Sequence, residues 1–381
     1  MLIVNITFYW SINGSNYLNI LTFIFSIMEL VSRILERDME LFHDDLKCEV
    51  NEKASDSDVK LVADFTEYNP LHNGHFHCMK VAKSHVPDSL FVAVVPGMFE
   101  RSGRGIPYIL PRELRAEIAV SLGADVVVEG PPMGIMGSGQ YSLCLCKMFQ
   151  ALGTDFIPRG YNPHPGFDEI LKRINMGHHI APKPYKIVDK TTGEILLKDK
   201  LKEDNYVITS FSNSLSKIGF DFNGKFIFVE RIEGVSGTRI REAVMSGNFS
   251  SVEDMMPSKT IEVLSQNGDS IIFGKRKWDW IVDNANSLDL SGLNLFNDKL
   301  ASELMSGRPF DDKDDLISAI PQGFSTHFKE RVLSILENPI EKKDISEFIE
   351  KYPSRIRVLK YKNGDVLDVF KEKVKTENVS A

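Results

Sequence analysis

The segment at residues 59–83 constrains the fold more than any other part of the chain, because it joins a buried strand to a helix through a turn with two histidines. The apolar run at residues 59–65 predicts a buried strand, and residues 76–83 predict the opening turns of a helix. Between them stands the string EYNPLHNGH at residues 67–75. A strand followed directly by a helix is typical of an α/β fold.

The histidines His72 and His75 therefore lie where the helix begins. Unpaired backbone N–H groups and the positive end of the helix dipole favour phosphate at such a point. Gly74 lets the backbone approach a ligand closely, and imidazoles can donate hydrogen bonds to phosphate oxygens. Two other interpretations stay open: a solvated or capping role, and half of a metal site with His77 and Cys78. The spacing favours phosphate over metal, since no second ligand pair follows at a recognisable interval.

A second motif, SGTRIREA at residues 236–243, has the same chemistry. Ser236 and Thr238 lead into a predicted helix that carries Arg241 in its first turns. Such a start offers N–H groups, hydroxyl donors and a cation to a polyphosphate. The alternative is a simple N-cap with Arg241 on a solvated face. The presence of the histidine turn in the same chain favours the phosphate interpretation.

Buried strands alternate with helices along most of the chain. The strands are predicted at residues 59–65, 89–97, 124–129, 154–160 and 225–230, and further helices at 111–120 and 140–152. This alternation predicts an α/β fold with a doubly wound parallel sheet, in which ligands bind at the carboxyl ends of the strands.

Three regions are expected. Residues 1–57 form an N-terminal extension, residues 58–255 a nucleotide-binding domain, and residues 256–381 a smaller, mostly helical C-terminal domain. An insertion at about 164–205 contains a predicted hairpin (185–188 and 195–198). The C-terminal helices are predicted near residues 258–265, 297–305, 325–336 and 344–351, followed by a terminal hairpin around Asn363 and Gly364.

The apolar stretch at residues 17–31 is shorter than the ~20 residues that span a bilayer, and no Lys or Arg precedes it. It is interpreted as an amphipathic helix, a weak membrane anchor, or an extension from a wrongly chosen start codon. The last is favoured, with Met28 or Met39 as the start, because the nucleotide-binding unit is expected to need nothing before about Val59. No stable membrane insertion is expected.

Composition places the chain among globular proteins and leaves room for two domains at 381 residues. The formal net charge of −8 argues against extensive coating of nucleic acid, although it is compatible with a local basic face. The four cysteines, Cys48, Cys78, Cys144 and Cys146, lack the spacing of redox or zinc motifs. A reducing, cytoplasmic setting is therefore expected.

The string EYNPLHNGH resembles the H-x-G-H motif of the HIGH-motif nucleotidyltransferase superfamily, and its extended form is similar to the opening motif of the tRNA(Met) cytidine acetate ligase family. The resemblance implies a Rossmann-like fold, binding of ATP or CTP with Mg²⁺, and nucleotidyl transfer to a small-molecule acceptor with release of pyrophosphate. In the acetate ligase family that acceptor is acetate, and the acetyl-adenylate acylates a tRNA cytidine. tRNA is therefore an implied partner.

The motifs and the resemblance together assign the site. SGTRIREA resembles the S-x-x-x-I-R element that contacts the β- and γ-phosphates in the superfamily. Catalytic roles go to His72, His75 and Arg241, with no metal ligand among the side chains. Nucleotide-binding roles go to Phe65, Glu67, Tyr68, Asn69, Asn73, Gly74, Gly160, Asn213, Arg231, Ser236 and Thr238.

Weaker matches lie between the two motifs. Gly160 matches the glycine of the family's F-G-S-E, with Tyr161-Asn162 in place of Ser-Glu. Asn213 is loosely similar to the asparagine of N-N-I-L, with a turn asparagine as the alternative, and Arg231 is similar to the arginine of the next strand. LRAEIA at residues 114–119 is similar to R-A-E-M-A, but a surface pair is the favoured interpretation of its arginine and glutamate, Arg115 and Glu117.

The resemblance thins in the last third of the chain. KYPSRIR at residues 351–357 is faintly similar to the family's K-R-Y-T-x-x-R-I-R run, which helps hold tRNA, and a solvated basic face is the alternative. Two other functions stay open. One is a cofactor or CDP-alcohol type transferase acting on a small phosphorylated substrate. The other is a non-catalytic nucleotide- or RNA-binding protein of the same fold.

Overall fold

The predicted strand–turn–helix junction lies in the middle of a parallel sheet. The computed structural model describes residues 15–50, 54, 57–183, 185–199, 201–272, 274–374 and 379–380. Strand β1 (Leu61–Phe65) leads into helix α2 (Asn73–His85). It pairs in parallel with β2 (Leu90–Pro96), which pairs in parallel with β3 (Val126–Gly130).

The chain then crosses to the other side of β1. Strand β4 (Ile157–Tyr161) lies beside β1, through a parallel bridge between Val62 and Phe156, and pairs in parallel with β8 (Phe226–Glu230). Because the winding direction reverses between β1 and β4, the carboxyl ends of these two strands border the crevice where doubly wound folds bind ligands. The histidine turn follows β1 at that crevice.

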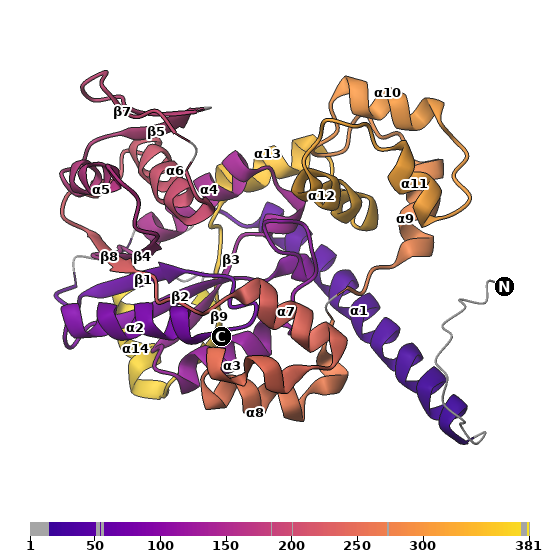
Figure 1. Cartoon of the computed structure of the whole chain (residues 1–381), viewed down its shortest axis with the longest axis horizontal. Coiled ribbons are helices and arrows are strands. Elements are labelled where there is room, and N and C mark those ends of the chain that lie inside the picture. The colour runs from indigo at the N-terminus through magenta and orange to yellow at the C-terminus, as the bar shows by residue number, and fades with distance from the viewer. Residues whose placement is uncertain are drawn as a thin grey trace.

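Helices cover both faces of the sheet, as Figure 1 shows. All residues of β1, β2 and β3 are buried, which explains their continuous apolar runs. One face packs against α2, α3 (Arg112–Ser121), α7 (Gly237–Ser246) and α8 (Ser258–Gln266). The other packs against α4 (Ser138–Ala151), α5 (Phe167–Asn175) and α6 (Glu203–Lys217). The predicted doubly wound α/β architecture is confirmed.

The predicted hairpin within the insertion is present. Strands β6 (Lys186–Asp189) and β7 (Ile195–Leu197) pair antiparallel, and β5 (Ile180–Lys183) adds a third strand that the sequence did not predict. Helix α6 packs against β5, so this small sheet is anchored to the main body.

The C-terminal region is mostly helical, as expected. It contains α9 (Trp278–Ser287), α10 (Asp298–Ser306), α11 (Lys313–Ala319), α12 (Thr326–Glu337) and α13 (Lys342–Lys351). Of these, α9 and α11 were not predicted. Short 3₁₀ helices connect the larger elements: η1 (Met98–Glu100), η2 (Met133–Ile135), η3 (Phe249–Met255) and η4 (Gly268–Ser270).

The predicted terminal hairpin is wrong. Strand β9 (Ile356–Tyr361) pairs antiparallel with β3, and helix α14 (Gly364–Val374) starts where the hairpin turn was expected. Asn363 accepts a hydrogen bond from the N–H of Val366 at 3.0 Å and so caps a helix rather than turning a hairpin. A two-residue strand, β10 (Val379–Ser380), pairs with β9. The boundary at residue 256 stays a prediction, but the region beyond it supplies an edge strand of the sheet.

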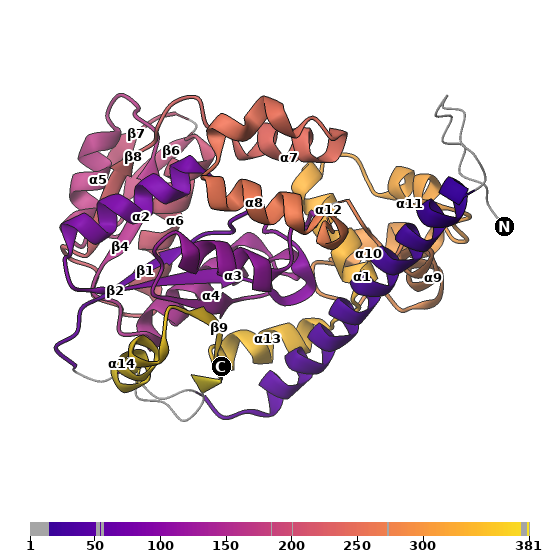
Figure 2. The same cartoon turned by 90° about the horizontal axis from the view of Figure 1, so that it is seen from below.

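Helix α1 (Ser15–Lys47) corrects the expectation that nothing before Val59 is needed. Val31, Leu35 and Phe42 are buried, and Phe42 stacks on Phe348 of α13 at 5.1 Å. Figure 2 shows α1 passing beside α13. The side chains before Met28 lie outside the described part of the structure, and the interpretations of residues 17–31 stay predictions. None of the described helices is long and apolar enough to cross a membrane.

Asp38 ties α1 to the sheet domain through buried charge. Its carboxylate accepts hydrogen bonds from both terminal nitrogens of Arg112, at 2.6 and 2.9 Å, and from the N–H of Phe99 at 2.6 Å. Arg112 also lies 2.8 Å from Glu129 of β3. A start at Met39 would remove Asp38 and leave the buried guanidinium of Arg112 without this partner.

We expect Asp38→Ala to lower the free energy of unfolding by about 3 kcal/mol, because one partner of a buried ion pair is removed. The matched control is Glu29→Ala on the same helix. The Glu29–Arg33 pair is largely exposed, so its loss should change stability by less than about 0.5 kcal/mol. Urea unfolding followed by circular dichroism measures both variants. Equal, small losses would contradict a structural role for α1.

Candidate active site

Backbone hydrogen bonds hold the two histidines of the turn in place. His72 is the N-cap of α2, and its Nδ1 accepts from the N–H of Gly74 at 3.2 Å. The Nδ1 of His75 accepts from the N–H of His72 at 3.4 Å. The two rings stack with centroids 3.8 Å apart and an interplanar angle of 15°. A Cβ on residue 74 would lie 3.1 Å from the His72 ring, which explains the glycine.

These bonds fix the proton on each ring. Because each Nδ1 accepts a hydrogen bond, a neutral ring carries its proton on Nε2, the edge that points away from the backbone. Burial, aided by the charges of Arg231 and Arg241, lowers the pKa of His72 to about 4. Burial and the neighbouring His72 hold the pKa of His75 well below its usual range. Both side chains are therefore neutral Nε2–H donors near neutral pH.

The start of α7 lies against this donor edge. A Cβ built on Gly237, the first residue of α7, would lie 3.5 Å from Nε2 of His72. Ser236 is the N-cap, and its hydroxyl oxygen accepts from the N–H of Arg239 at 3.3 Å. Arg241 donates to the Asn69 carbonyl oxygen at 3.2 Å and to the Thr238 hydroxyl at 2.9 Å. The two predicted phosphate motifs are thus brought together.

Several motif residues point into the protein. The Asn69 side chain accepts from the N–H of Ile109 at 2.7 Å, and Asn73 donates to the carbonyl oxygen of Asp254 at 2.8 Å. Tyr68 is buried, and its ring meets that of His75 edge to face with the centroids 5.4 Å apart. Phe65 is buried at the end of β1. Three of these residues are buried and Asn73 is partly exposed, and the predicted nucleotide contacts of all four stay predictions.

Arg115 is not the surface residue that was expected. It is buried, and its guanidinium donates to three backbone carbonyl oxygens, those of Glu67 at 2.8 Å, Pro96 at 2.9 Å and Leu110 at 3.0 Å. It also bonds Glu100 at 2.8 Å. Sequence reasoning missed this because an arginine on an amphipathic helix is usually solvated. Here it fastens the turn to β2 and α3.

The residues of β4 and β8 complete one side of the crevice. Gly160 pairs with Val229, and the Arg231 N–H donates to the Tyr161 carbonyl oxygen at 3.1 Å. The Arg231 side chain is paired with Asp204, which also accepts from the Asn162 side chain at 2.7 Å. The charges of Arg231 and Asp204 both act on the pKa of His72, which puts the pair beside the turn.

The side chain of Asn213 contacts the insertion and none of the other predicted site residues in the described structure. The residue is in the middle of α6 rather than in a turn, and its amide oxygen is 2.6 Å from Nε2 of His179. Its recorded partner thus belongs to the insertion, and the predicted contact of Asn213 with a nucleotide stays untested.

Two residues of the crevice were missed. Asp64 on β1 is buried. Burial raises the pKa of its carboxyl to about 7, although the positive charge of Arg159 acts in the opposite direction. Arg159 donates to the carbonyl oxygen of Phe65 at 2.7 Å and lies 3.4 Å from Asp64. The sequence did contain a signal for this pair, since each of two predicted strands carries a charged residue. An unpaired buried charge is costly, so two such residues in neighbouring strands indicate an ion pair.

The metal interpretation gains no support from the described residues, among which no group of three or more His, Cys, Asp or Glu side chains could hold an ion. Cys78 is buried, and burial raises the pKa of its thiol. A buried thiol of this kind disfavours the thiolate that metals bind.

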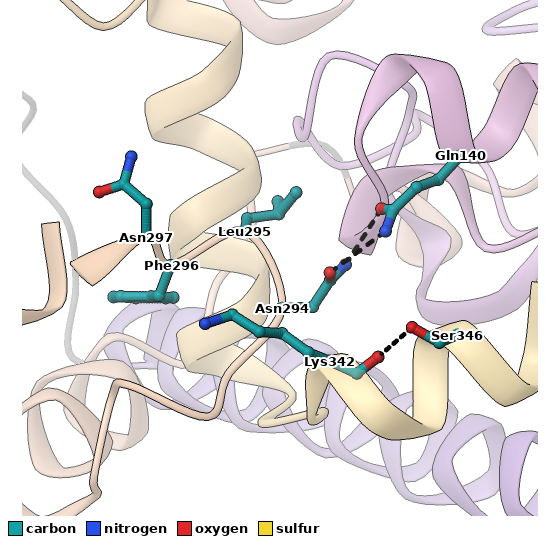
Figure 3. Close-up of a pocket in the computed structure, with 7 residues that line it drawn as sticks. All are labelled: Gln140, Asn294, Leu295, Phe296, Asn297, Lys342 and Ser346. Carbon is teal, nitrogen blue, oxygen red and sulfur yellow. Dashed lines mark hydrogen bonds between the residues drawn. The ribbon is translucent and has the colours of Figure 1, made fainter. Parts of the chain in front are cut away.

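A separate pocket, drawn in Figure 3, contains none of the predicted site residues. Gln140 of α4 and Asn294 exchange amide hydrogen bonds at 3.3 and 3.4 Å on its wall. The other lining residues are Leu295, Phe296, Asn297, Lys342 and Ser346.

Comparison with known proteins decides the family. Residues 59–155 match the family described as HIGH Nucleotidyl Transferase, and residues 162–360 match the Cytidyltransferase-related C-terminal region. The chain belongs to the HIGH nucleotidyltransferase family. The superfamily resemblance predicted from EYNPLHNGH is confirmed.

Relatives of this HIGH nucleotidyltransferase include proteins with and without an assigned reaction. An uncharacterized protein of Methanocaldococcus jannaschii is 45% identical over 91% of this chain and 98% of that protein. The tRNA(Met) cytidine acetate ligase of Fervidobacterium nodosum is 24% identical over 84% of each chain. The fold matches Thermotoga maritima TmcAL bound with alpha-thio ATP at a TM-score of 0.69, with 20% identity over 84% of this chain and 85% of that one.

The KYPSRIR run of this HIGH nucleotidyltransferase is largely occupied by structural contacts. Arg357 is paired with Asp45 of α1 and with Glu129 of β3, the latter at 3.0 Å. Lys351 donates to the carbonyl oxygen of Leu46 and lies 3.1 Å from Glu347. These pairs fasten α1 to the sheet, so a role of this run in holding tRNA draws little support from its contacts.

The low pKa of His72 predicts a pH effect on stability. Between pH 6.5 and about 4 the unfolded chain binds a proton at this residue and the folded chain does not, so acidification destabilises the fold. His72→Asn keeps an acceptor for the Gly74 N–H but removes the titration. On lowering the pH from 7 to 4.5, we expect the wild type to lose about 2 kcal/mol more unfolding free energy than His72→Asn. Urea unfolding at both pH values measures this, and equal losses would contradict it.

Proposed function

We propose that this protein is a nucleotidyltransferase that binds ATP or CTP, transfers the nucleotidyl group to an acceptor and releases pyrophosphate. The observation that carries the proposal is the closeness of the His72 Nε2 edge to the first residue of α7, where a Cβ added to Gly237 would lie 3.5 Å from Nε2. Arg241 lies at the same place, since that Cβ would be 3.3 Å from its Nη1, and the His75 ring stacks on that of His72. A polyphosphate is the ligand whose charge and acceptor oxygens fit such a group.

In the proposed reaction, an acceptor oxygen attacks the α-phosphorus of the nucleotide in line. The bond from the α-phosphorus to the bridging oxygen breaks, and pyrophosphate leaves toward the start of α7. His72 and His75 donate from Nε2 to the phosphate oxygens on which charge grows, while Ser236, Thr238 and Arg241 receive the leaving group. No protein nucleophile is required, because positioning and electrostatics supply the rate enhancement.

The acceptor proposed first is acetate, which would give acetyl-adenylate and then an acetylated tRNA cytidine. The relation to tRNA(Met) cytidine acetate ligases over 84% of the chain supports it. A small phosphorylated acceptor, as in cofactor or CDP-alcohol synthesis, is the second candidate. The match of residues 162–360 to a cytidyltransferase-related region supports this second candidate. The proposal that the protein binds tRNA is weakened by the contacts of the KYPSRIR run within the protein.

Mg²⁺ commonly binds the phosphates together with one or two carboxylates. Two of the carboxylates near the turn are Asp204, which is held by Arg231 and Asn162, and Asp64, which faces Arg159. Both are already paired with cations, so they do not fit a resident Mg²⁺ site, and any such ion would rely on the nucleotide phosphates. No step of the proposed mechanism is assigned to it.

The proposal is tested by pyrophosphate release from ATP or CTP with acetate, with and without tRNA, and with a panel of phosphorylated acceptors. His75→Asn keeps a side-chain acceptor for the His72 N–H but lacks the Nε2 donor. We expect kcat to fall by about 10²- to 10³-fold, as for loss of one transition-state donor. His77→Asn, two residues along the same helix, is the matched control and should retain activity.

An unchanged rate in His75→Asn would contradict the assignment of the histidines. Nucleotide binding in calorimetry, without pyrophosphate release for any acceptor, would favour the non-catalytic nucleotide-binding alternative.

A further inference from the structure

The sheet opens between β1 and β4 at the edge that carries the site. Backbone bonding between them is confined to their amino ends: the Leu61 carbonyl oxygen accepts from the N–H groups of Asp155 at 2.9 Å and Phe156 at 3.2 Å, and the Ala63 N–H donates to the Phe156 carbonyl oxygen at 3.0 Å. Beyond these bonds, β1 stays paired with β2 as far as Phe65, and β4 with β8 as far as Tyr161. Among the described residues no further backbone pairing joins β1 to β4, so the strands part toward their carboxyl ends.

The Arg159 side chain occupies this opening. Its Nη1 donates to the carbonyl oxygen of Phe65 at 2.7 Å and lies 3.4 Å from Asp64. Its guanidinium carbon is 5.3 Å from the ring centroid of Phe211 and 5.8 Å from that of Phe65. One carbonyl oxygen and two aromatic rings therefore hold the Arg159 guanidinium. Among the described residues its only acidic partner is Asp64, at the long distance of 3.4 Å.

The guanidinium has unused donor capacity. Only 14% of the side chain is exposed, yet Nε has no hydrogen-bond partner among the described residues, and both recorded bonds come from Nη1. A buried donor without a partner is costly and calls for an explanation. The charge of Arg159 also contributes to the low pKa of His75, which shows that it lies close to the histidine turn.

We propose that Arg159 is a further nucleotide-binding residue, which donates from its guanidinium to a phosphate oxygen of the bound nucleotide on the His75 side of the crevice. The inference rests on the proposed function and deepens it, because it adds a fork-shaped donor on β4 to those on α2 and α7. A phosphate fits this donor better than a nucleobase because the guanidinium is planar, charged and bidentate.

The test is calorimetric titration of the full chain with ATP and with adenosine, which lacks phosphate. We expect Arg159→Gln to weaken ATP binding by roughly 10- to 100-fold, the loss typical of a hydrogen bond between charged groups, and to leave adenosine binding within about threefold. Arg159→Lys should recover part of the ATP affinity, since it keeps the charge and loses the fork. The ratio of the two affinities in one sample does not depend on how much of the variant is folded.

An unchanged ATP affinity in Arg159→Gln would overturn the inference while leaving the proposed function intact. Equal losses for ATP and adenosine would also overturn it, because they would indicate a structural or base-contacting role. A wild-type chain that binds neither ATP nor CTP would instead overturn the proposed function, and the inference with it.

Discussion

The chemistry of this protein depends on two hydrogen bonds in which backbone N–H groups donate to the Nδ1 atoms of His72 and His75. They cap helix α2, hold the rings in a stack and leave the proton of each ring on Nε2. Burial removes the competing charged form, since the pKa of His72 falls to about 4 and that of His75 falls well below its usual range. The result is a pair of neutral donors whose direction is set by the backbone.

Buried charges keep this turn in place from several directions. Arg115 draws the carbonyl oxygens of Glu67 and Pro96 together, and the Glu67 side chain accepts from the N–H of Gly103 at 2.8 Å. The C-terminal region braces that same loop, because Arg331 of α12 donates to the Gly103 carbonyl oxygen at 2.9 Å. Gly105 has a φ of +83°, and a Cβ there would lie 2.4 Å from the Arg331 nitrogen. The turn is therefore continuous with elements far along the chain.

Local chemistry explains what could be predicted from the sequence. The strands of the sheet are continuous apolar runs, and the two helix starts carry capping and phosphate-binding residue types, so both motifs and their meeting at one sheet edge were predictable. The failures concern residues whose roles come from distant partners. Arg115 and Asp64 are buried because of contacts with other elements, α1 is fastened by Asp38, and β9 joins the sheet at β3. Asn213 lies in helix α6, which packs on β5, and local composition had favoured a turn there.

The most direct measurement is a crystal structure of the chain with a non-hydrolysable ATP analogue. The account predicts a triphosphate between the Nε2 atoms of His72 and His75 on one side and the backbone amides of residues 237 and 238 on the other. A nucleotide bound away from both helix starts, for example in the pocket of Figure 3, would contradict the assignment of this site.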